Sequence, residues 1–122
     1  MIWTLYHVAV RILFAGLRAA SLWREDARKW VEGRQDFFSR LERLRREKIP
    51  EDRECIWFHV SSLGEFEQGR PLIEMIRKNF PEKPICLSFF SPSGYEIRKN
   101  YENADIVCYF PSDIRSEVRK FL

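Results

Sequence analysis

The residues best suited to chemistry lie in a short polar turn, Ser61-Ser62-Leu63-Gly64-Glu65, which follows an apolar stretch. The turn ends in a carboxylate, Glu65, where a helix is expected to begin. A carboxylate at the edge of a cleft can accept a proton from a bound hydroxyl group, which is the role of a general base. Gly64 leaves room beside it, because glycine has no side chain to hinder a substrate.

The same glutamate also has a structural explanation. A carboxylate in the first turn of a helix complements the helix dipole and stabilises the helix by about 0.3–1 kcal/mol. The dipole favours the ionised form and so weakens the base, whereas burial in a cleft would act in the opposite direction. From the turn alone, both interpretations of Glu65 stay open.

The segments around the turn predict an α/β fold. Three continuous apolar runs are typical of buried strands, and a helical pattern follows each of them. The predicted strands are residues 55–60, 84–90 and 105–110. This β-α-β-α-β-α alternation implies a parallel sheet with right-handed crossovers, covered by helices on both faces.

The predicted helices place the turns at one edge of that sheet. The first helix ends near Asn79, the second spans residues 95–101 with Ser93 as its N-cap, and the third spans residues 114–122. Sites in parallel α/β folds lie beyond the carboxyl ends of the strands. The turns that should therefore gather along one edge are 61–64, 91–94 and 111–113.

The charge of the chain is unevenly distributed. The 122 residues carry a net charge of +3. Residues 1–48 hold 11 basic and 6 acidic side chains, whereas residues 49–122 hold 10 and 12. The basic excess thus accompanies the most apolar stretch, a pairing that suits an anionic membrane surface. No basic patch alternates with aromatic residues elsewhere, so nucleic acid is not an expected partner.

Residues 1–23 predict an amphipathic membrane-anchor helix. A helix over Ile2–Leu22 would be roughly 31 Å long, but arginine at its centre opposes a simple span. Its polar side chains fall on one narrow stripe and leave a broad apolar face, the pattern of a helix lying in the membrane interface. The stripe consists of Thr4, His7, Arg11, Arg18 and Ser21. A helix packed on the protein's own core is the alternative.

Residues 24–53 form a charged helical connector in this interpretation, with a break or bend at Gly33. Cys55, Cys86 and Cys108 each fall in a predicted buried strand, where they are expected to be reduced core residues. Their spacing, and that of the two histidines, does not match a metal site.

Three stretches within residues 54–122 resemble the N-terminal domain of bacterial Kdo (3-deoxy-D-manno-octulosonic acid) transferases. They are HVSSLGEFEQGRPLIEMIRKNFP, LSFFSPSGYEIRKNYENAD and VCYFPSDIRSEVRKFL. The resemblance implies a partial Rossmann-like acceptor domain of a glycosyltransferase B architecture over residues 54–122. It also implies an apolar anchor helix at the N-terminus, and a location on the cytoplasmic face of the inner membrane.

The resemblance implies a reaction as well. Glu65 would deprotonate a hydroxyl of a lipid A precursor, whose oxygen would displace CMP from CMP-Kdo with inversion and without a metal or cofactor. Arg70 is a candidate acceptor contact on the helix, although a surface arginine is its ordinary role. The turn candidates, for which making the turn is the alternative role, are Ser62, Gly64, Ser93 and Gly94.

The resemblance places donor binding in a C-terminal nucleotide-sugar domain beyond Leu122, so these 122 residues are expected to be inactive alone. Two other hypotheses stay open. The first is a truncated, non-catalytic fragment of the same fold that binds membrane or acceptor. The second, ranked last, is a flavodoxin-like or response-regulator domain, because the first turn has neither a phosphate-binding loop nor an acidic cluster.

Overall fold

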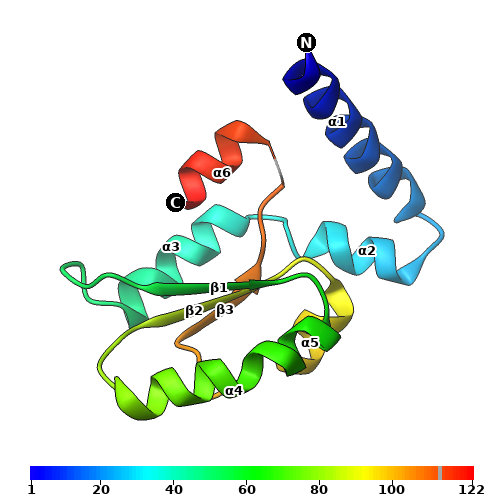
Figure 1. The fold of residues 1–122 in the computed structure, drawn as a ribbon. Coiled ribbons are helices and arrows are strands. Elements are labelled where there is room, and N and C mark those ends of the chain that lie inside the picture. Colours follow the sequence, from blue (N-terminus) through cyan, green and yellow to red (C-terminus); the bar gives the residue numbers. More distant parts are fainter. Residues whose placement is uncertain (113) are drawn as a thin grey trace. The chain divides into compact units, whose positions relative to one another are not determined.

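The computed structural model describes residues 1–112 and 114–122 (Figure 1). Asp113, part of the third predicted turn, lies outside the described residues. The chain divides into two compact units, one made of Met1–Gln35 with Pro111–Leu122 and the other of Asp36–Phe110. The boundaries predicted after residues 23 and 53 stay predictions.

The second unit contains a three-stranded sheet. Its strands are β1 (Ile56–Val60), β2 (Ile85–Phe89) and β3 (Ile106–Tyr109), which are parallel and lie in the order β1-β2-β3. Each predicted strand is one residue too long at one or both ends, as is common where strands fray into turns. The prediction of an α/β fold with a parallel sheet is confirmed.

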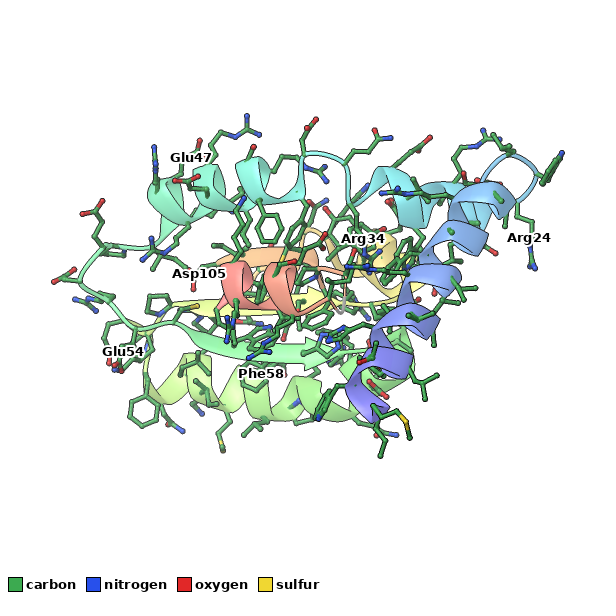
Figure 2. All side chains as sticks on the ribbon, turned by 90° about the horizontal axis from the view of Figure 1, so that it is seen from above. Arg24, Arg34, Glu47, Glu54, Phe58 and Asp105 are labelled. Atoms are coloured by element: carbon green, nitrogen blue, oxygen red, sulfur yellow. The ribbon has the colours of Figure 1, made fainter. Side chains whose placement is uncertain are left out.

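One face of the sheet packs on α4 (Leu63–Asn79) and α5 (Pro92–Arg98), and α3 (Phe37–Lys48) lies on the other face (Figure 1). Because side chains alternate along a strand, every second residue of β2 points to the α4 side. Phe58, labelled in Figure 2, packs against the same core from β1. The fully buried residues of this core are Phe66, Ile73, Ile85, Leu87 and Phe89.

The prediction of continuously buried strands is wrong for β1. Only Val60 of this strand is buried, and Trp57 and His59 on alternate positions are exposed. Trp57 and His59 lie on the face of the sheet opposite α4, where α3 packs on β3 rather than on β1. Cys55 was expected inside a buried strand, but it precedes β1 and is exposed. All three cysteines are free, and the other two are buried.

An ion pair closes the amino end of the sheet. Asp105, labelled in Figure 2, precedes β3, and its Oδ2 accepts hydrogen bonds from Arg77 Nη2 at 2.6 Å and from the backbone N–H of Ile85 at 2.7 Å. The same arginine donates to the backbone oxygens of Asn103, Pro81 and Lys83. One side chain thus donates to three loop carbonyls.

The first unit contains α1 (Ile2–Ala20), α2 (Glu25–Glu32) and α6 (Arg115–Phe121). The predicted break at Gly33 is confirmed, because α2 ends at Glu32 and Gly33 is its C-cap. No residue of α1 is buried, and Phe14 contacts the Trp30 ring at 4.8 Å between centroids. Among the described residues no single helix is long and apolar enough to cross a membrane. Together α1 and α2, bent by 118°, meet that criterion by length and composition only.

Gly94 is required by packing at the start of α5. A methyl group added there would lie 2.7 Å from Phe89 Cδ1 and 3.1 Å from the backbone nitrogen of Leu63. The Phe89 ring is fully buried and the Leu63 nitrogen belongs to the backbone, so neither can move aside freely.

We therefore expect Gly94→Ala to lower the free energy of unfolding by about 1–3 kcal/mol, measured by urea denaturation. Gly69→Ala in α4 is the matched control, because a methyl group there meets nothing within 4 Å. The control should be neutral or more stable by about 0.5–1 kcal/mol. Equal stability of the Gly94 variant and the wild type would contradict this role.

Candidate active site

The predicted base, Glu65, lies in the first turn of α4, directly after β1. Ser62 is the N-cap of the helix, and its Oγ accepts a hydrogen bond from the Glu65 backbone N–H at 3.3 Å. The Glu65 side chain turns back, and its Oε2 accepts from the Ser61 backbone N–H at 2.6 Å. This reciprocal arrangement closely resembles a capping box, so the structural explanation of Glu65 holds in part.

The carboxylate still has capacity for chemistry. Glu65 is exposed, and no hydrogen bond in residues 1–112 and 114–122 involves its Oε1. The cap therefore fixes the direction of the carboxylate through one oxygen and leaves the other open to a ligand. Gly64 beside it is also exposed, and a methyl group there would meet only Ser62 Oγ, at 3.8 Å.

The second predicted turn lies against the first. Two backbone hydrogen bonds continue the β1–β2 ladder beyond the strands, from Phe90 N to Val60 O at 3.1 Å and from Ser91 N to Ser61 O at 2.9 Å. The expected gathering of these two turns at the carboxyl edge of the sheet is confirmed.

The sequence predicted Ser93 as the N-cap of the second helix, and this prediction is wrong. The N-cap is Ser91, whose Oγ accepts from Gly94 N at 3.5 Å and pairs with Ser93 Oγ at 2.7 Å. The helix accordingly begins three residues earlier than predicted, at Pro92, because proline fits the first helical position. Ser93 stays exposed at the edge, whereas Gly94 is buried in packing.

Arg70 lies one and a half turns further along α4. It forms ion pairs with Glu67 at 3.3 Å and with Glu74 at 3.8 Å, and Arg98 of α5 also pairs with Glu67 at 2.5 Å. These contacts account for Arg70 as a surface residue of α4. Its predicted contact with the acceptor stays a prediction.

The sequence interpretation missed a polar cluster on the opposite face of the sheet. Ser88, fully buried in β2, accepts a hydrogen bond from Trp57 Nε1 at 2.8 Å, and its Oγ lies 2.9 Å from His59 Nδ1. The Phe110 ring packs on both aromatic side chains, with centroids 6.0 Å from Trp57 and 4.5 Å from His59. The available signal was a serine inside the apolar run ICLSF.

His59 belongs to the same edge as the base. Burial lowers the pKa of His59 below its ordinary value of 6.5, while a hydrogen bond to the Ser88 backbone and the charge of Glu65 act in the opposite direction. In the described part of the chain, no group of three or more potential ligands could hold a metal ion.

Two curated glycosyltransferases are similar in sequence to part of this chain. One relative is a bifunctional glycosyltransferase/methyltransferase of Fusobacterium nucleatum, 34% identical over 74 residues, which are 58% of this chain and 11% of that protein. Another is the 3-deoxy-D-manno-octulosonic acid transferase of Haemophilus influenzae, 25% identical over 68 residues, which are 55% of this chain and 16% of that protein.

Residues 35–122 match the family described as 3-deoxy-D-manno-octulosonic-acid transferase (Kdo transferase), and the chain belongs to this family. The match covers most of the chain, and together with the relatives it supports a glycosyltransferase role. The aligned segments span only 11% and 16% of the two relatives. No solved structure matches the chain.

Proposed function

We propose that this chain is the acceptor-binding part of an inverting glycosyltransferase of lipopolysaccharide biosynthesis. It would move Kdo from CMP-Kdo to a lipid A precursor, with Glu65 as the general base. The observation that supports this most is the open Oε1 of Glu65, oriented by the Ser61 N–H at the edge where sites form in parallel α/β folds.

The chemistry follows from that geometry. Glu65 accepts the proton of an acceptor hydroxyl group as its oxygen forms a bond to the anomeric carbon of Kdo. The bond from that carbon to the CMP phosphate breaks on the opposite side, CMP leaves with the electron pair, and the configuration inverts. Neither a metal nor a cofactor is part of this proposal. A separate nucleotide-sugar domain of the glycosyltransferase B architecture would bind CMP-Kdo, so the 122 residues alone would bind acceptor without transferring Kdo.

A membrane surface is the proposed second partner, on the cytoplasmic face of the inner membrane. Apolar side chains of α1 are exposed to solvent, with exposed fractions of 75% for Trp3, 64% for Leu5 and 66% for Ile12. A pocket of about 630 Å³ within the first unit is lined by arginines and aromatic residues, which suits lipid phosphates beside acyl chains. Its lining includes Trp3, His7, Arg11, Arg115 and Arg119.

Gly64→Ala tests the proposed acceptor approach. The new methyl group meets no close atom of the protein, so the fold should be unchanged, but it would occupy space beside the Glu65 carboxylate. We expect the acceptor KM to rise about 10-fold or more, corresponding to a loss of about 1.4 kcal/mol, in a preparation that includes the donor domain.

Gly69→Ala again supplies the control, because it adds the same methyl group to the same helix at a position away from the turn. Its KM for the acceptor should equal that of the wild type. An unchanged KM in the Gly64 variant, with both proteins folded, would rule out a close approach of the acceptor at this turn.

A further inference from the structure

The His59–Ser88 pair determines which ring nitrogen of His59 carries the proton. Ser88 Oγ already accepts the Trp57 Nε1–H at 2.8 Å, and its own hydrogen has two possible acceptors. One is His59 Nδ1 at 2.9 Å, and the other is the Phe58 backbone oxygen at 3.5 Å. Since hydroxyl donors weaken steeply at such long distances, Nδ1 is the better acceptor.

A hydrogen bond from Ser88 to Nδ1 requires that Nδ1 be unprotonated. In neutral imidazole the proton then resides on Nε2. Protonation of the ring would force Nδ1–H towards Ser88 and leave the hydroxyl with the Phe58 oxygen at 3.5 Å. This arrangement favours a neutral ring with its proton on Nε2.

The Nε2 side of His59 is the open side. No hydrogen bond in the described residues involves Nε2, and the residue is exposed although its ring packs on Phe110. His59 is the penultimate residue of β1, two positions before Ser61, whose N–H holds the Glu65 carboxylate. His59 and the backbone N–H that holds the Glu65 carboxylate therefore both lie at the carboxyl end of β1.

We propose that His59 binds the sugar acceptor by donating a hydrogen bond from Nε2–H to an acceptor oxygen, and that Ser88 is the positioning residue for this donor. The proposal rests on the proposed function, because it names a specificity contact of the same site. A neutral donor is suited to this place, since it binds a hydroxyl oxygen without forming an ion pair with the base.

Nuclear magnetic resonance of the ¹⁵N-labelled chain tests the tautomer directly. The chain has two histidines, so His7→Gln assigns the ring signals of His59. Long-range ¹⁵N–¹H spectra at pH 7.5 should show the Nε2–H tautomer of His59, and Ser88→Ala should give a mixture of tautomers. A Nδ1–H tautomer in the wild type would overturn the proposal.

Titration with a deacylated lipid A precursor tests the contact. The His59 Nε2 signal and the Gly64 amide signal should both shift, with one dissociation constant. If Gly64 responds and His59 does not, the acceptor binds without this donor and the proposal fails while the proposed function survives. If no signal in the chain responds, acceptor binding by these residues fails, and the proposed function fails with it.

Two variants measure how much the Nε2–H donor of His59 contributes to acceptor affinity. His59→Phe keeps an aromatic ring against Phe110 but removes the N–H, and we expect the dissociation constant for the deacylated acceptor to rise about 10-fold. His59→Gln retains an N–H donor near the position of Nε2 and should recover affinity to within about 3-fold of the wild type. Equal weakening by both variants would indicate a packing role and would contradict the proposal.

Discussion

Glu65→Gln is expected to lower kcat for Kdo transfer by about 10²–10⁴-fold, the range that a general base contributes. Glutamine has the same shape, and its amide oxygen can still accept the Ser61 N–H, so the cap at the start of α4 should persist. It cannot take a proton from the acceptor hydroxyl. Turnover of labelled CMP-Kdo, in a preparation that includes the donor domain, measures this effect.

Glu67→Gln is the control for this substitution, because it removes a carboxylate two residues further along the same helix. That carboxylate pairs with Arg98 and Arg70 on the surface, so its loss should reduce stability slightly and leave kcat unchanged. Donor binding should be intact in both variants. Near-normal turnover of Glu65→Gln would remove Glu65 from the mechanism.

Deletion of residues 1–23 should release the protein from anionic vesicles. The deleted segment contains α1, in which no residue is buried and whose apolar side chains would otherwise face water. Apolar burial in the interface and attraction between arginines and anionic lipids are both lost. We expect at least a 100-fold drop in the partition coefficient, measured by cosedimentation with phosphatidylglycerol-containing vesicles.

The double variant Arg11→Gln, Arg18→Gln separates the two contributions. This variant keeps the whole apolar face of α1. Each arginine near an anionic surface contributes about 1 kcal/mol to the free energy of binding, so the loss of two should lower the affinity for anionic vesicles about 30-fold. Affinity for zwitterionic vesicles should be unchanged. Continued pelleting of the deletion variant with anionic vesicles would show that α1 is not the anchor.

The sequence could predict the features that depend on local pattern. Apolar runs separated by helical segments predicted the parallel sheet, and Gly33 predicted the break between two helices. Both predictions depend only on residues that are neighbours in the sequence. The edge position of β1 could not be predicted in this way. It depends on which strands pair, and the exposure of Trp57 in an apolar run depends on α3 packing on β3 rather than on β1.

The candidate site divides in the same manner. Glu65 and Ser62 belong to one turn, so their capping interaction depends on five consecutive residues of the sequence. The contact of His59 with Ser88 joins residues 29 positions apart and requires the β1–β2 register, in which these two residues are direct partners. A serine inside the apolar run ICLSF was the local signal, but it does not show which residue the serine contacts.

The backbone hydrogen bonds from Phe90 to Val60 and from Ser91 to Ser61 connect the two turns directly. An inserted residue in either turn would shift the other as well, because the ladder passes through both before α4 and α5 begin. For protein engineering, the two turns therefore form one unit. Its specificity should be altered by substituting side chains without changing the length of either turn, or by replacing both turns together.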